Sequence, residues 1–154
     1  KMCIDFANEF KDNTLFIEAY ETNGLALLKA GSDIFKMPSW HEPCGLMQVH
    51  ANYYGTVPVA NRIGGLDDTI KDGVTGFLTD KTYTKDVEGA LPKNIDAFSE
   101  TLKRALNVFY NDKDKFNEIA LNGMKTDYSW KNGSIQEYER VMKIKPSGSA
   151  SSQA

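Results

Sequence analysis

The chain has 154 residues, of which 41% are hydrophobic and 25% are charged, and its formal net charge is −3. This length suits one domain, and these proportions exclude a disordered chain, a collagen or a coiled coil. The negative charge argues against a nucleic-acid partner, which attracts basic domains. No apolar run approaches the roughly 20 residues that cross a bilayer, so no membrane partner is expected.

Two cysteines, Cys3 and Cys44, are too few for a disulfide scaffold. A reducing compartment, the cytoplasm, is therefore the expected location. The chain begins with Lys1 instead of Met, and its first residues lack the apolar stretch of a signal peptide. We expect it to be a piece of a longer protein.

In chain order, the first half alternates between helical and extended patterns. The helical patterns cover residues 1–12, 24–30, 45–54 and 66–71. The extended patterns cover residues 14–20, 33–37, 56–60 and 75–78. Pro58 is unfavourable inside a strand because it has no N–H to donate. This alternation is typical of a parallel, doubly wound α/β sheet.

The second half has no further strand pattern. A polar loop is expected over residues 81–92, ending at a proline. Three helices are then predicted over residues 95–110, 113–125 and 129–143. The last residues, 146–154, are small and polar and predict a flexible tail. We therefore expect one domain over residues 1–145, followed by this tail.

Ligands bind at the carboxyl ends of strands in such sheets, and two loops there carry candidate residues. The first loop, residues 38–45, contains Glu42, whose carboxylate can hold sugar hydroxyls or stabilise a developing positive charge. The N–H groups of Cys44, Gly45 and Leu46 would begin the next helix and suit an anion. The alternative is an acid that only complements the helix dipole.

The second loop, residues 61–66, contains the pair Gly64-Gly65. Adjacent glycines let the backbone approach a ligand closely, although an ordinary turn explains them equally well. Arg62 can pair with phosphate or have no specific role. Asp67 and Asp68 are expected to be acids of a helix N-terminus.

Other chemistries are poorly supported. Cys44 lies near His41, but the sequence offers no third group to orient a thiol–imidazole pair. His41, His50 and Cys44 lack a recognised metal-ligand spacing, so no metal is expected. Neither a P-loop nor a G-x-G-x-x-G dinucleotide motif is present.

Five blocks together resemble starch synthases and bacterial-type glycogen synthases. They are MPSWHEPCGL (37–46), YGTVPV (54–59), RIGGLDDT (62–69), DGVTGF (72–77) and NGMKTDYSW (122–130). They occur in the family's order, and the resemblance covers roughly residues 13–143. It also accounts for Pro58, which the family keeps in that strand.

The resemblance implies a GT-B glycosyltransferase, of which this chain is the later part of the C-terminal, donor-binding domain. The fold implied is a partial Rossmann-like parallel sheet followed by C-terminal helices. The family transfers glucose from ADP-glucose, or from UDP-glucose in some members, to the non-reducing end of an α-1,4-glucan. The transfer retains the anomeric configuration and needs no metal or cofactor. A plant-type member would be in the plastid.

The resemblance also assigns site residues. Glu42 matches the family's essential acid, which contacts the donor glucose. The donor contacts implied are Tyr20, on the adenine, and Cys44, Gly45, Leu46, Gly64, Gly65 and Leu66. Backbone dipoles at these loops would hold the leaving diphosphate while the acid orients the sugar.

This chain departs from the family pattern in places. Met47 stands where the family usually has a Thr or Asn that reaches phosphate, and Ile63 replaces a Thr. Trp40 and His41 replace a more usual pair, and His50 stands where related sugar transferases keep a second Glu. Met47 supports the alternative of a non-catalytic binding or regulatory protein.

The family's phosphate-binding Arg and Lys, and its acceptor motif, have no counterpart in this sequence. The family sheet places two further strands between the segments 14–20 and 33–37. We therefore expect these segments not to be neighbours here, and the isolated chain to be inactive without the remainder of the enzyme.

Overall fold

The structure is a computed structural model that describes residues 2–17, 22–84, 87–129 and 134–142. Its strands are β1 (Ile34–Met37), β2 (Val57–Ala60) and β3 (Phe77–Leu78). Its helices are α1 (Met2–Glu9), α2 (Thr22–Ala30), α3 (Met47–Tyr53), α4 (Gly65–Thr69), α5 (Ala90–Asn111), α6 (Lys113–Lys125) and α7 (Ser134–Met142). The predicted tail, 146–154, lies outside the described residues.

The strands form a parallel sheet in the order β1-β2-β3, which confirms the predicted fold class. Ile34 is in register with Val57, and Val59 with Phe77. The strand predicted over residues 14–20 is wrong where it is described, because residues 14–17 are not in a strand. A strand needs a neighbour to bond to, and within the described chain β1 pairs only with β2.

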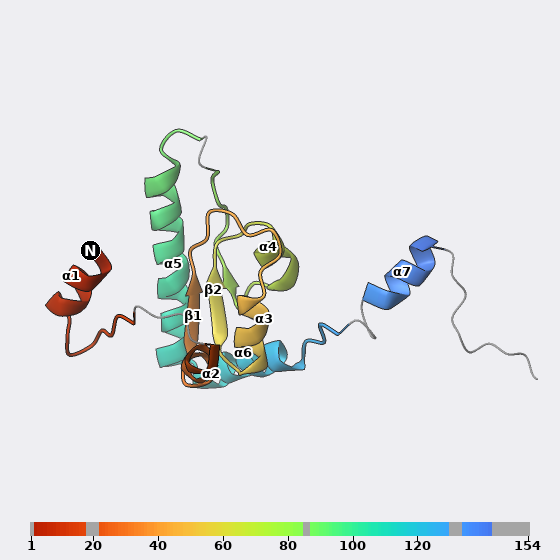
Figure 1. The fold of residues 1–154 in the computed structure, drawn as a ribbon, viewed down its shortest axis with the longest axis horizontal. Coiled ribbons are helices and arrows are strands. Elements are labelled where there is room, and N and C mark those ends of the chain that lie inside the picture. Colours follow the sequence, from red (N-terminus) through yellow and green to blue (C-terminus); the bar gives the residue numbers. More distant parts are fainter. Residues whose placement is uncertain (1, 18–21, 85–86, 130–133, 143–154) are drawn as a thin grey trace, which may run out of the picture.

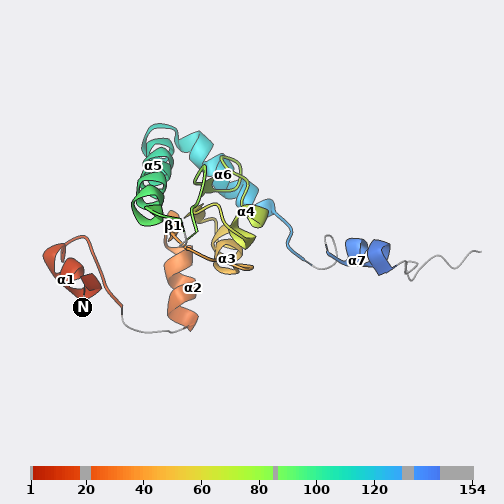
Figure 2. The same cartoon turned by 90° about the horizontal axis from the view of Figure 1, so that it is seen from above.

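Helices cover both faces of the sheet (Figures 1 and 2). Val57 and Val59 point to the face covered by α5 and α6, where they pack with Ala105, Phe116 and Ile119. The alternate residue Ala60 points to the opposite face. There it packs with Met37 of β1, Leu66 of α4, Ile70 just after α4, and Leu78 of β3. The carboxyl ends of the strands thus emerge between two packed layers.

Pro58 lies in the central strand and is fully buried. Val57 and Asn61 donate their N–H groups to β1, at Asp33 O and Met37 O. Because successive N–H groups of a strand point alternately to its two neighbours, the missing N–H of Pro58 is on the β3 side, before the first pair of β3. The strand therefore forgoes no ladder bond at Pro58.

Several helices begin at other residues than predicted, and two of these differences have a clear local cause. Helix α3 begins at Met47 because Gly45 has a φ of +69°, which no helical residue adopts. Helix α5 begins at Ala90, so Pro92, predicted to lie in a loop, is in its first turn. Proline is tolerated there because the first N–H groups of a helix have no partner within it.

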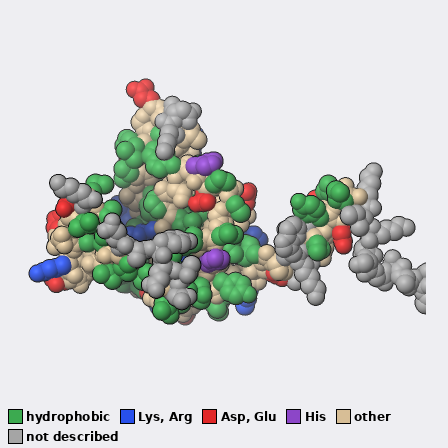
Figure 3. Space-filling model, viewed as in Figure 1, with side chains coloured by type: hydrophobic (Ala, Val, Ile, Leu, Met, Phe, Trp, Pro, Cys, Tyr) green, Lys and Arg blue, Asp and Glu red, His purple; other side chains and the backbone are tan. Residues whose placement is uncertain are grey.

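Helices α1 and α7 lie away from the sheet in both views (Figures 1 and 2). Each exposes apolar side chains, among them Phe6, Ile135 and Val141. In Figure 3, apolar side chains also gather over the lower part of the body, around α2. No described helix is long and apolar enough to cross a membrane.

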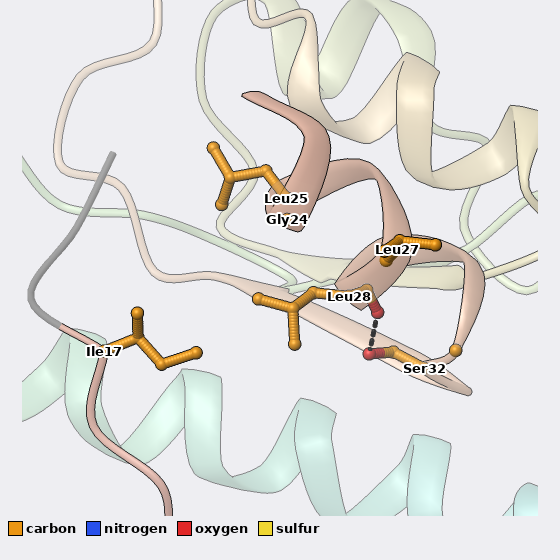
Figure 4. A pocket seen from close by; sticks show the side chains of 7 residues that line it. Ile17, Gly24, Leu25, Leu27, Leu28 and Ser32 are labelled. Carbon is orange, nitrogen blue, oxygen red and sulfur yellow. Dashed lines mark hydrogen bonds between the residues drawn. The ribbon is translucent and has the colours of Figure 1, made fainter. Parts of the chain in front are cut away.

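An apolar cavity of about 480 Å³ lies beside α2 (Figure 4). Leu25 and Leu28 of α2 and Ile17 of the preceding segment line it, and Ser32 donates to the carbonyl of Leu28 at its border. Leu27, on the same helix, is 75% exposed. This surface is separate from the two loops that carry the candidate site residues.

Candidate functional site

The loop between β1 and α3 carries Glu42 at the carboxyl end of the sheet. Glu42 is half-buried, and its Oε2 accepts a long hydrogen bond of 3.5 Å from the hydroxyl of Ser39. The carboxylate makes no other hydrogen bond with the described residues, so it keeps most of its acceptor capacity. An acid in this state is able to accept hydrogen bonds from a polyhydroxylated ligand.

The glycine loop lies directly against this loop. The N–H of Gly65 donates to the carbonyl oxygen of Glu42 over 2.8 Å. A Cβ on Gly64 would lie 2.1 Å from that same oxygen, and one on Gly65 would lie 1.8 Å from the carbonyl oxygen of Cys44. The paired glycines thus allow a close approach to the backbone of the Glu42 loop, and the close approach to a ligand stays a prediction.

Gln48 of α3 fixes both loops from inside, a role that the sequence reading missed. Its side chain is fully buried, and its Nε2 donates to Gly45 O at 2.8 Å and to Thr69 Oγ1 at 2.9 Å. The hydroxyl of Thr69 in turn donates to Gly65 O. The only signal in the sequence is a glutamine shortly after Gly45, where the third helix of the alternating pattern begins.

The remaining predicted donor contacts are spread over different environments. Cys44 is exposed with a free thiol, and Leu46 is 62% exposed. The side chain of Leu66 is fully buried in the core, so it is not available to a ligand. Tyr20 lies outside the described residues. The N–H groups of Cys44, Gly45 and Leu46 precede α3 and do not form its first turn.

Arg62 is committed to contacts within the chain. Its Nη1 lies 2.6 Å from Asp67 Oδ1, and its Nε donates to Thr79 O at 2.9 Å. Asp67 and Asp68 lie in the first turn of α4, as predicted. The pairing with Asp67 favours a structural role for Arg62 over phosphate binding.

An ion pair supports the sheet beneath the site. Both guanidinium ends of Arg104 contact the carboxylate of Asp72, at 2.6 and 2.8 Å, and Asp72 also accepts from the N–H of Leu78. Burial by itself would raise the pKa of Asp72. The hydrogen bonds from Arg104 and Leu78 and the charge of Arg104 outweigh it and lower this pKa. The pair therefore joins α5 to the segment that precedes β3.

Metal-binding side chains do not gather at these loops. His41, His50 and Cys44 are exposed. Across the part of the chain that the structure describes, no three His, Cys, Asp or Glu side chains are placed to hold a metal ion.

Comparison with known proteins gives a family match over most of the chain. The profile of the family "Glycosyl transferases group 1" matches residues 7–120. Granule-bound starch synthase 1 of Pisum sativum is 43% identical over 102 residues, which are 66% of this chain and 16% of the pea protein. A glycogen synthase of Thermodesulfovibrio yellowstonii is 43% identical over 71% of this chain and 20% of its own length. The chain thus spans a fifth or less of these two relatives.

Solved structures also match this chain over most of its length. The catalytic domain of starch synthase IV from Arabidopsis thaliana, bound to ADP and acarbose, matches with a TM-score of 0.69 and 28% identity. The match covers 91% of this chain and 28% of that one. Anabaena HepE in complex with UDP matches with a TM-score of 0.55 and 26% identity, over 76% of this chain and 29% of its own.

Proposed function

Because the chain belongs to the glycosyl transferases group 1 family, we propose that it is the donor-binding part of a retaining glucosyltransferase. The complete enzyme moves glucose from ADP-glucose, or from UDP-glucose, to the non-reducing end of an α-1,4-glucan. Relatives named starch synthase and glycogen synthase support this substrate class. The observation that carries the proposal is the 2.8 Å bond between Gly65 and Glu42, which joins the acid-bearing loop to the glycine loop.

In this proposal Glu42 is the catalytic residue. Its carboxylate accepts hydrogen bonds from the donor glucose and stabilises the positive charge that develops at C1 as the bond to the diphosphate breaks. The backbone of Cys44, Gly45, Leu46, Gly64, Gly65 and Leu66 borders the donor, and Tyr20 stacks on its base. The scheme uses no resident metal or organic cofactor. Its partners are the nucleotide sugar, the glucan and the rest of the enzyme.

We expect the 154-residue chain alone to bind the donor without turning it over. Arg62, the cation of the glycine loop, is paired with Asp67, so the diphosphate needs cations from the rest of the enzyme. The relatives are several times longer than this chain, which leaves room for those cations and for the acceptor site. A glycogen synthase would act in the cytoplasm, and a plant starch synthase in the plastid.

A thermal melt of the chain with and without millimolar ADP or ADP-glucose tests the proposal. A ligand at about 100 times its dissociation constant adds roughly 2.7 kcal/mol, or about 5–10 °C in a domain of this size. We expect both ligands to raise the melting temperature, and ADP-glucose to raise it further than ADP. A cooperative melt that neither ligand shifts would contradict donor binding.

One observation favours the second candidate, a non-catalytic binding or regulatory protein. Met47 is the first residue of α3, next to the Glu42 loop, and its thioether is a weak hydrogen-bond acceptor that donates nothing to a phosphate. Under this alternative the fold persists and ADP has no effect. The variant Met47→Thr distinguishes the two candidates. In the donor-binding part of a glucosyltransferase it increases the shift of the melting temperature with ADP, and in a non-catalytic protein it produces no such shift.

A further inference from the structure

We propose that a cavity on the α5 side of the candidate site binds a glucose unit of the glucan, an inference that rests on the proposed function. The cavity has a volume of about 330 Å³, near the lower end of small-molecule sites. It is called the Trp40 cavity below. The residues that line it include Pro38, Trp40, Asn61, Ile95, Phe98 and Ser99.

The walls of the Trp40 cavity are mainly apolar and aromatic. Trp40 and Phe98 supply rings, and Ile95 is 54% exposed at the cavity although it belongs to a long, well-packed helix. Apolar walls with a few placed polar groups are typical of small-ligand sites. The C–H faces of a sugar ring pack well on such walls, while its hydroxyls need polar partners.

Asn61 supplies a polar group of the required kind. It is 4% exposed, and its Nδ2 donates to the carbonyl of Ser39 at 3.0 Å. Since the carbonyl of Ser39 can only accept a hydrogen bond, the atom of the Asn61 amide that faces it must be the donor Nδ2. The other end of the amide is therefore Oδ1. This oxygen is buried, and none of the described residues donates a hydrogen bond to it. Asn94 of the same cavity differs, because both ends of its amide are bonded to the backbone of Tyr83.

The unpaired group selects the class of ligand. An unpaired carbonyl oxygen attracts a donor such as a hydroxyl, and it repels phosphate and carboxylate oxygens. Among the residues that the structure describes, no lysine or arginine lines the Trp40 cavity to offset that repulsion. The cavity therefore suits a neutral polyol and not the diphosphate of the donor.

The cavity is also joined to Glu42. Ser39 accepts from Asn61 through its carbonyl and donates to Glu42 through its hydroxyl. Trp40 is the next residue of the same loop. A glucan unit in the Trp40 cavity and the donor glucose at Glu42 would therefore lie on two sides of one short loop, as acceptor and donor of one transfer can.

Titration with maltohexaose tests the inference on the intact chain. In a Trp130→Phe background, Trp40 is the sole tryptophan, and its emission should change saturably with the sugar. Calorimetry then compares Asn61→Ala with Tyr110→Ala, which alters an exposed aromatic at the other end of α5. We expect Asn61→Ala to weaken binding about tenfold, as loss of one hydrogen bond implies, and Tyr110→Ala to leave it unchanged.

Ile95→Ala changes an exposed side chain in the wall of the Trp40 cavity. We expect it to weaken maltohexaose binding as well, independently of the Asn61 amide. Constant Trp40 emission, or binding that neither Asn61→Ala nor Ile95→Ala weakens, would overturn the inference. The ADP melt is read separately. If ADP shifts the melt and maltohexaose does not bind, the proposed function stands and the inference about the Trp40 cavity is refuted. If maltohexaose binds and ADP causes no shift, the proposed donor binding is refuted and sugar binding at the Trp40 cavity stands.

Discussion

The N–H of Gly65 and the carbonyl oxygen of Glu42 meet at 2.8 Å across two loops that are far apart in sequence. Because this bond is between backbone groups, it is independent of the Glu42 carboxylate. The acid is thus held in place by its main chain while its side chain is left for a ligand.

Gly64→Ala should lower the free energy of unfolding by about 2–4 kcal/mol, because its Cβ would overlap the Glu42 carbonyl at 2.1 Å. Gly73→Ala is the matched control. Gly73 also has a positive φ, of +69°, but an added Cβ there meets nothing within 4 Å. We expect it to cost only the backbone strain, about 1 kcal/mol. Urea unfolding of both variants gives the comparison, and equal losses would argue against the contact between the loops.

Gln48→Leu should destabilise the chain by about 2 kcal/mol, because Gly45 O and Thr69 Oγ1 lose their donor. Part of the cost is offset, since the unpaired Oε1 of Gln48 also disappears. Thr69→Val removes the hydroxyl alone and should cost less. Chemical denaturation measures both, and a Gln48→Leu chain as stable as the parent would refute the role assigned to Gln48.

Stability should depend on pH through Asp72. Its pKa is lowered in the folded state, so its contribution is fully present above the ordinary aspartate value of about 3.9 and is lost as pH falls below that value. Asp72→Asn should cost about 1–2 kcal/mol at neutral pH, a range reduced for the partial exposure of the pair. Melts from pH 7 to pH 3 should show this difference shrinking. Asp68→Asn, an exposed acid of α4, serves as control, and a difference that stays constant with pH would contradict the assignment.

Glu42→Gln should leave the fold intact and remove the preference for the sugar-bearing ligand. The carboxylate makes only the 3.5 Å contact with Ser39 in the described structure, so the change in stability should stay within about 0.5 kcal/mol. The melting shift with ADP should persist, while the additional shift with ADP-glucose is lost. Glu88→Gln, at an exposed acid before α5, should retain both shifts. Loss of the ADP shift itself in Glu42→Gln would contradict a role limited to the sugar.

Much of the fold was predictable because strands and helices alternate and turn-forming residues separate them. The strands near residues 34, 57 and 77 and the helices α3 to α6 follow apolar periodicity bounded by Gly, Pro and Asp. The segment 14–17 shows the limit of this reading. Its composition favours a strand, but a strand forms only beside another, and composition carries no information on neighbours. Pro92 shows the reverse error, since proline breaks a helix interior but suits a first turn.

The candidate site was predictable in its loops and not in its internal contacts. Position after a strand pointed to Glu42 and to Gly64-Gly65, and the structure brings them together. The roles of Gln48 and Asn61 were missed because both depend on which backbone carbonyls the fold places beside them. Leu66 was identified by its place in a motif, yet its side chain is in the core. The assignment of donor contacts to these residues stays a prediction.

The parallel register of the sheet has a consequence for how the chain folds. Every strand pair joins segments separated by a helix, α3 between β1 and β2 and α4 between β2 and β3. Among the described strands no hairpin is available to nucleate the sheet, so loop-closure entropy must be overcome before any ladder bond forms. The sheet should therefore form more slowly than α5, whose hydrogen bonds are all local.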